Sequence, residues 1–299
     1  MVGLEAQYRT SLQSELKRYP NICVEDIAAV QEWIATQPHL PQIYDVQIAH
    51  FLHASYYDVE IAKNAIEHYY TYKASMTEFF TDWDPLSTRL AGYVSKVLYA
   101  AFLPKQSPES CQMILLRLRD PSLDLYSFNL SVKWLLMSVT AQLLSEGQQS
   151  EYKIIYDADS YTMSHVMRNP LSAVRHYLDF GQKASAIRVV EIHFINSSSV
   201  VKKLISLVKP FMNKHIMKML HFHTSSDAFF KSLPKDQTPS DYGGTAPSLD
   251  VLTAENTKRV EEMREALLAH NQQKVDESKR IGKKKKSKVE EDFKKLEID

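Results

Sequence analysis

The middle third of the chain alternates short, β-branched apolar runs with stretches long enough to form helices. The apolar runs lie at 114–118, 153–156 and 188–195, and turn residues bound each of them. The helix-length stretches lie at 123–145, 170–182 and 198–208. This alternation predicts an α/β fold with a mostly parallel sheet and crossover helices, and a further short strand is expected at 219–223.

The residues before this region have a helical pattern instead. Between residues 5 and 80, apolar side chains recur three and four positions apart, as in Ile48 and Leu52. Asp58 has the side chain and the position of a helix N-cap. The first third of the chain is therefore predicted to be a small helical bundle.

These changes of pattern predict where the chain divides. We expect an all-helical N-terminal module over 1–90, an α/β domain over 91–250, and a charged C-terminal helix and tail over 251–299. Within the last part, 257–273 has the spacing of an amphipathic helix. Lysines at 283–286 open a charged run, which is either a solvated tail or a nuclear-import or anionic-lipid patch.

Glycine is scarce, with 7 residues among 299. None of them forms GxGxxG, GxxxxGK[ST] or GxSxG, so the signatures of a Rossmann dinucleotide site, a P-loop and an α/β-hydrolase elbow are missing. Basic and acidic residues balance at 36 each, so the whole chain has no basic field for nucleic acid. The sequence argues against all of these classes of protein.

The only cysteines are Cys23 and Cys111, too few for a disulfide scaffold or a CxxC metal site. The first residues contain no apolar signal-peptide core, and charged residues interrupt every candidate membrane span. We therefore expect a soluble, cytoplasmic protein, and a monomer.

Three groups of residues have types that occur in catalytic or metal sites. His221 and His223 would project from one face of a strand, but no third ligand follows at a zinc-type spacing, so no metal is expected. The serines at 197–199 fit a nucleophile or a helix N-cap, and the missing flanking glycine favours the cap. Asp157 and Asp159 fit acid–base catalysis or a structural turn. We expect no enzymatic activity, with a hydrolase or transferase as a remote alternative.

An apolar stripe marks the helix expected at 198–208. Val201, Leu204, Ile205 and Val208 recur on one side of it. Such a helix either packs directly on the sheet or closes over an apolar cavity. Composition does not separate these two arrangements.

Two groups of motifs, in chain order, resemble the CRAL-TRIO family. The motifs of the first half are 45–52 (DVQIAHFL), 57–60 (YDVE) and 69–70 (YY). Those of the second half are 192–196 (IHFIN), 209–211 (KPF), 221–223 (HFH) and 242–244 (YGG). The resemblance covers about 43–250, and residues 277–299 further resemble the C-termini of insect α-tocopherol transfer protein-like members.

The resemblance implies a lipid-binding and lipid-transfer protein. It would hold one hydrophobic molecule, such as a tocopherol, retinoid, carotenoid or other isoprenoid, in a cavity beneath a mobile lid at 200–211. No cofactor other than this lipid is implied. The ligand-binding residues implied by position are Leu136, Val139, Tyr156, Tyr161, Val174, Tyr177, Leu178, Val189, Ile192, Phe194, Val201, Leu204, Ile205, Val208 and Phe211.

The chain departs from the family where relatives contact a phosphoinositide headgroup. The arginines of those relatives are replaced by His50, His53 and Ser55, and only Arg188 remains of a basic pair on the later strand. The resemblance implies a membrane surface, and possible phosphoinositides, as transient partners. The donors that remain for an anionic headgroup are Arg188, Lys202, Lys203, Lys214 and Lys218.

A different function is open within the same fold. A regulatory or adaptor module would bind a protein or a membrane phosphoinositide without transferring lipid. Bulky side chains that meet beneath the lid and fill the cavity would favour it.

Overall fold

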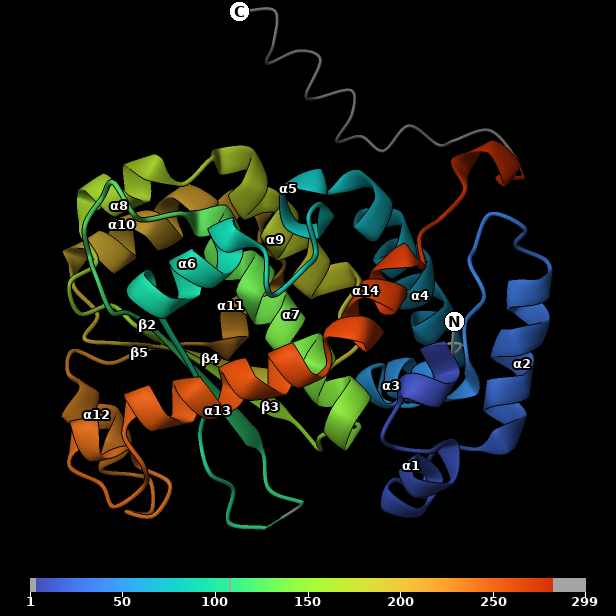
Figure 1. The fold of residues 1–299 in the computed structure, drawn as a ribbon, viewed down its shortest axis with the longest axis horizontal. Helices are drawn as coiled ribbons and strands as arrows, with labels where there is room; N and C mark the ends of the chain where they lie inside the picture. Colours follow the sequence, from blue (N-terminus) through green and yellow to red (C-terminus); the bar gives the residue numbers. More distant parts are fainter. Residues whose placement is uncertain (1–3, 108, 282–299) are drawn as a thin grey trace, which may run out of the picture.

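The N-terminal third is built from helices, as its apolar spacing predicts. The structure is a computed structural model that describes residues 4–107 and 109–281. Asp58 is the expected N-cap, because its carboxylate accepts a hydrogen bond of 2.9 Å from the Ile61 amide. The first helices are α1 (Leu12–Arg18), α2 (Val24–Ala35), α3 (Asp45–Ala54), α4 (Val59–Ser75) and α5 (Thr77–Phe80). α1 to α4 lie together on one side of the molecule, beside the part that contains the sheet, and α5 lies above the middle (Figure 1).

Five strands form one sheet in chain order. They are β1 (Leu98–Phe102), β2 (Gln112–Leu118), β3 (Tyr152–Asp157), β4 (Val189–Ile195) and β5 (Leu220–Phe222). β2 to β5 run parallel, and β1 pairs antiparallel with β2 at the edge. The mostly parallel sheet and its four expected strands are confirmed. β1 was not predicted, because its residues follow α6 (Thr88–Val97) with no turn residue between the two elements.

Helices connect the parallel strands and cover both faces of the sheet. After α6 these helices are α7 (Phe128–Glu146), α8 (Met163–Arg168), α9 (Leu171–Lys183), α10 (Ser199–Val208), α11 (Lys214–Met219), α12 (Ser226–Phe230), α13 (Leu249–Glu262) and α14 (Arg264–Gln272). Short 3-10 turns lie at Leu4–Gln7, Lys209–Phe211, Ser240–Tyr242 and Glu277–Lys279. α7 joins β2 to β3, α8 and α9 join β3 to β4, and α10 and α11 join β4 to β5. The alternation of strands and helices in the sequence predicts these crossover connections.

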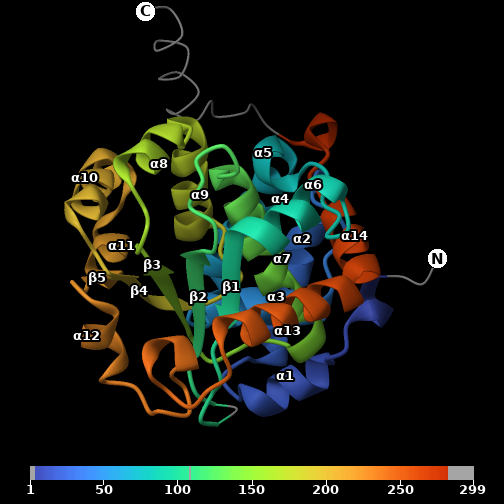
Figure 2. The ribbon, with the colours of Figure 1, turned by 60° about the vertical axis from the view of Figure 1, so that its left-hand side comes forward.

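The two faces of the sheet have different surroundings because successive side chains of a strand point in opposite directions. Leu116, Tyr156 and Phe194 are neighbours in register and share the face covered by α7 to α10. Leu115 and Ile155 lie on the other face, in a buried cluster with residues of α12 and α13. Figure 2 shows α8 to α10 on one side of the strands and α13 on the other.

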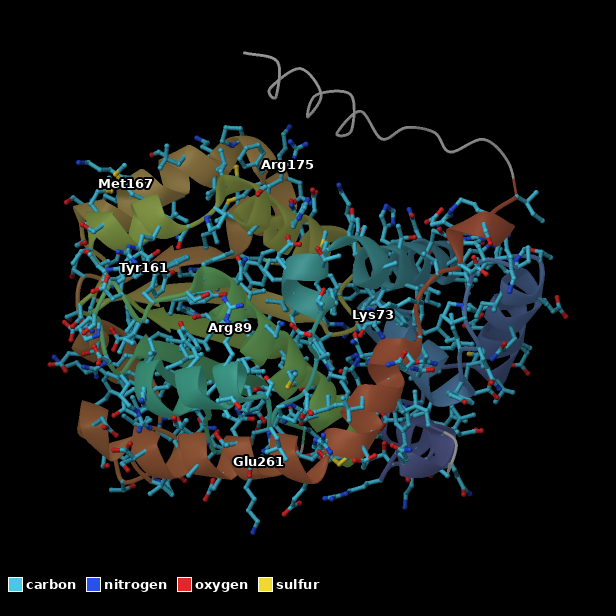
Figure 3. The ribbon with its side chains drawn as sticks, turned by 45° about the horizontal axis from the view of Figure 1, so that its top comes forward. Lys73, Arg89, Tyr161, Met167, Arg175 and Glu261 are labelled. Atoms are coloured by element: carbon cyan, nitrogen blue, oxygen red, sulfur yellow. The ribbon has the colours of Figure 1, made fainter. Side chains whose placement is uncertain are left out.

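The C-terminal segment is bent where one helix was expected at 257–273. α13 ends and α14 begins on either side of Met263. α13 packs along β1 and α7, whereas α14 reaches the N-terminal helices, where the Lys73 amino group of α4 donates to the His270 carbonyl (Figure 3). The bend at Met263 lets the chain bury Val260 against the sheet domain and Leu267 against the helices.

Two sequence predictions concern membranes and the charged tail. Within residues 4–107 and 109–281, no helix combines the length and the apolar character needed to cross a membrane. The lysine run at 283–286 lies outside the described residues.

Candidate functional site

A cavity separates the sheet from the helices that cover its first face. Its volume is about 280 Å³. Residues of β2, β3 and β4 form its floor, and residues of α7, α9 and α10 form its walls and cover. Nearly all of its lining surface is apolar. A space of this size and character suits one hydrophobic small molecule.

Most of the residues that the resemblance implied for ligand binding line this cavity. They are Tyr156, Tyr161, Val174, Tyr177, Leu178, Val189, Ile192, Phe194, Val201, Leu204, Ile205 and Val208. They come from β3, β4, α9 and α10, and from the turn after β3. The fold therefore brings residues spread over fifty positions of the sequence around one space.

Two expected wall residues on α7, Leu136 and Val139, lie outside the lining and pack against the main core. The side of α7 that faces the cavity carries Phe128, Val132 and Leu135 instead. α7 is buried nearly all round, so its apolar pattern has no solvent side to define the direction of the cavity. A shift of one residue along a helix turns the side chain by about 100°.

Phe211, expected as the last residue of the lid, also lies outside the lining. It belongs to the 3-10 turn Lys209–Phe211 that follows α10. Its ring lies 5.3 Å from the Arg175 guanidinium of α9, and its carbonyl accepts a hydrogen bond from Gln182. The turn therefore directs Phe211 toward α9 and not into the cavity.

Other lining residues were not identified from the sequence. They include Leu98 of β1, Leu116 and Leu118 of β2, Tyr126, Asn169, Met212, Ile216 and Leu220. Leu116 and Leu118 carried a usable signal, because they alternate on the strand that pairs with β3. The others follow turns or helix ends, where no periodicity indicates a direction.

α10 covers the cavity with its apolar side. Val201 and Val208 are only 2% and 4% exposed, and Leu204 and Ile205 line the same space. Leu207, turned by about 100° from Val208 around the helix, is 58% exposed. Of the two arrangements left open by the sequence, the structure therefore has the helix above an apolar cavity.

Polar side chains lie at two points of the lining, and at each point they form hydrogen bonds with their own neighbours. Tyr126 donates to the Asn169 carbonyl oxygen at 2.9 Å, and the Asn169 amide donates to the Tyr161 hydroxyl at 2.8 Å. The Ser131 hydroxyl lies 2.6 Å from that of Tyr93. These contacts let the chain bury polar groups beside an apolar space without losing hydrogen bonds.

The basic residues proposed for an anionic headgroup have different surroundings. The Arg188 guanidinium lies 4.1 Å from the Tyr56 ring and 5.4 Å from the Tyr57 ring, and it donates to the His53 carbonyl. It therefore ties the start of β4 to the end of α3. The exposed candidates are Lys202, Lys203, Lys214 and Lys218, on α10 and α11.

His53, beside Arg188, makes stability depend on pH. Burial, together with the charges of Arg188 and His50, lowers the pKa of His53 from 6.5 to about 3. Between these values the unfolded chain binds a proton that the folded protein does not. We expect the free energy of unfolding to fall as the pH decreases from about 6.5 toward 3, by up to about 1.4 kcal/mol per pH unit from this group.

Urea unfolding over this pH range measures the effect. His53→Phe keeps an aromatic ring against Tyr19, whose centroid lies 4.3 Å away, and removes the titrating group. The variant should lose part of the acid-dependent slope. An unchanged slope would show that His53 is not a source of the pH dependence.

The histidines of the HFH motif lie on the face of the sheet opposite to the cavity. His223 Nε2 is 3.1 Å from His193 Nδ1, and the other ring nitrogen of His193 is 2.8 Å from a Glu191 carboxylate oxygen. His193 also packs on Phe229 of α12, with 4.7 Å between ring centroids. Among the residues that the structure describes, no group of three or more histidine, cysteine or acidic side chains could hold a metal ion.

Two of the serine and aspartate candidates, Ser198 and Asp157, have structural partners. Ser198 is the N-cap of α10, because its hydroxyl accepts from the Val200 amide. Asp157 accepts hydrogen bonds of 2.6 Å from the Tyr242 hydroxyl and 2.8 Å from the Asn196 amide. The carboxylate thereby fixes the YGG segment to the end of β3.

Comparison with known proteins identifies two families and several relatives. The CRAL/TRIO domain family matches residues 97–244, and the family described as Pinta-like, UBA domain matches residues 20–90. The chain is 23% identical over 251 residues to the Homo sapiens alpha-tocopherol transfer protein-like, covering 82% of this chain and 72% of that protein. It is 22% identical over 261 residues to Mus musculus clavesin-1, covering 84% and 72%. The crystal structure of Sfh5 aligns with 70% of this chain and 74% of that chain, with a TM-score of 0.48 and 11% identity.

Proposed function

This chain belongs to the CRAL-TRIO family, and we propose that it is a non-enzymatic carrier, which binds one hydrophobic small molecule beneath α10 and transfers it between membranes. The observation that carries this proposal is the apolar cavity of about 280 Å³ between the sheet and α10. Burial of a ligand contributes about 0.8 kcal/mol per CH₂ group, so a cavity of this kind favours a largely apolar molecule over a polar metabolite.

The names of the relatives narrow the class of ligand. The similarity to alpha-tocopherol transfer protein-like sequences supports a lipid as cargo. We propose a tocopherol, retinoid, carotenoid or other isoprenoid, carried in the cytoplasm by a monomer. The free thiols of Cys23 and Cys111 suit that reducing compartment.

Release requires a way out of the cavity, and α10 is the proposed lid. Three apolar side chains near it face solvent: Met167 is 81%, Leu171 57% and Leu207 58% exposed. They belong to α8, α9 and α10, and Figure 3 shows Met167 at the edge of the molecule. Together with Lys202 and Lys203, they offer an apolar and basic surface for a bilayer. Docking there would let α10 open into the membrane rather than into water.

The adaptor alternative receives less support from the same observations. A module that only binds a protein or a phosphoinositide has no need for an apolar cavity. Bulky side chains do not fill the space beneath α10, since Val201, Leu204, Ile205 and Val208 border a cavity. Arg188, which directly precedes β4, is engaged by Tyr56, so it is less available to a headgroup.

Ligand profiling of the full chain tests the proposal. The pure protein is incubated with a cell lipid extract, repurified and extracted, and the bound molecules are identified by mass spectrometry. We expect about one hydrophobic molecule per chain. Failure to recover any such molecule after repeated loading would overturn the carrier function. Transfer to phosphatidylcholine vesicles, with and without a phosphoinositide, then measures whether an anionic headgroup changes the rate of transfer.

A further inference from the structure

Two tyrosines meet across the cavity. Tyr156 comes from β3 and Tyr177 from α9, both line the space, and their hydroxyl oxygens are 2.6 Å apart. The Tyr156 ring stacks on Phe194 at 5.3 Å, and the Tyr177 ring meets Phe128 edge-on at 6.2 Å. The two hydroxyls therefore form a small polar point within a mostly aromatic part of the lining.

The hydrogen bonds of this pair do not use all of its protons. Burial raises the pKa of both tyrosines, so each hydroxyl keeps its proton at neutral pH. One proton forms the bond between the two oxygens, and the other has no second acceptor among residues 4–107 and 109–281. A buried hydroxyl proton without an acceptor is unfavourable, so the site is suited to a ligand that supplies an acceptor.

Each of the other hydroxyl groups of the lining has an acceptor for its proton. The Ser131 hydroxyl donates to the Ser127 carbonyl at 3.2 Å, so Tyr93 can donate to Ser131. Tyr126 donates to Asn169, and the Tyr161 hydroxyl can close that ring toward Tyr126 at 3.5 Å. The Arg117 guanidinium, which also belongs to the lining, contacts the carboxylates of Asp157 and Asp159. Among the hydroxyl groups of the described lining, the spare donor therefore lies at the Tyr156–Tyr177 pair.

We infer that the Tyr156–Tyr177 pair donates a hydrogen bond to an oxygen of the bound molecule, and so selects an oxygen-bearing lipid over a pure hydrocarbon of the same shape. The inference rests on the proposed function. The acceptor is a carbonyl, hydroxyl or ether oxygen, and the apolar parts on either side of it pack against Phe128 and Phe194. Either tyrosine can supply the proton, because it can then accept the hydrogen bond that the other tyrosine donates.

This interchangeability gives the inference a specific test. The full chain is loaded from an equimolar mixture of heptadecan-9-one and heptadecane, which have the same chain length, and the bound ratio is measured by mass spectrometry. The bound ratio of ketone to alkane is compared between the wild-type protein and its variants. The difference in water solubility between the two probes is the same in each measurement and therefore cancels. Tyr156→Phe and Tyr177→Phe each leave one free hydroxyl and should keep the ratio within about twofold. The double variant should lower it about fivefold.

Tyr99→Phe removes a hydroxyl from β1, outside the cavity, and should leave the ratio unchanged. An unchanged ratio in a double variant that still loads heptadecane would overturn the inference while leaving the carrier function intact. Failure of the wild-type protein to load either probe would instead count against the proposed function.

A second measurement does not depend on the variants. The carbonyl stretching frequency of heptadecan-9-one bound to the wild-type protein should be lower than in hexane, as expected for a carbonyl that accepts a hydrogen bond. A frequency equal to that in hexane would overturn the inference even if the double variant failed to fold.

Discussion

Leu204→Asp is expected to lower the affinity for the hydrophobic ligand about 100-fold. Leu204 lies on the side of α10 that lines the cavity. An aspartate there would place a carboxylate against apolar side chains and the ligand, at a cost of several kcal/mol, and about 2.7 kcal/mol corresponds to a factor of 100. The measurement is ligand retained per chain after gel filtration, followed by titration with the molecule found by profiling.

Leu207→Asp is the matched control, with the same substitution three residues later on the same helix. Leu207 is 58% exposed, so its replacement should leave retention within about twofold. The same variant should slow transfer to vesicles, because it removes an apolar group from the surface proposed to dock on the bilayer. Equal loss of retention in both variants would show that α10 has no separate ligand-facing side.

Gly244→Ala is expected to lower the free energy of unfolding by about 3 kcal/mol. A Cβ at this position would lie 1.7 Å from the Thr238 carbonyl oxygen and 2.4 Å from its carbon. These are backbone atoms, so relief of the clash must shift the segment that joins α12 to α13. The displacement would also disturb the Tyr242 hydrogen bond to Asp157 at the end of β3. Urea unfolding monitored by circular dichroism measures the loss.

Gly243→Ala distinguishes this clash from backbone strain. Gly243 has φ of +77°, and apart from its chain neighbours no atom of the described residues lies within 4 Å of the point that a Cβ would occupy. Its replacement should cost only about 1 kcal/mol, as for an L-residue placed in the left-handed region. A larger loss for Gly243→Ala than for Gly244→Ala would contradict the close approach to Thr238.

The sequence predicted the element types well where a repeating pattern was present. The four parallel strands and the amphipathic α10 followed from periods of two and of about 3.6 residues. β1 was missed because it joins α6 directly, and the bend at Met263 was missed because 257–273 has one continuous apolar pattern. Both features depend on surfaces that packing supplies from distant parts of the chain.

The cavity was predicted in kind but only partly in detail. Strand residues such as Tyr156 and Phe194 line the cavity as expected, because a strand has only two sides. Leu136 and Val139 of α7 lie outside its lining, because a helix buried all round gives no direction. The boundaries at 90 and 250, the monomeric state and the cytoplasmic location stay predictions.

The family, the order of strands and helices, and the apolar stripe of α10 follow from the sequence, because they depend on motifs and on local spacing. The sides that surround the cavity, the partners of Arg188 and the contact between Tyr156 and Tyr177 come from the packing of the folded chain. Such contacts join residues that lie far apart along the chain, as Arg188 and the His53 carbonyl do. Their geometry is set by how strands and helices pack, which local periodicity does not specify.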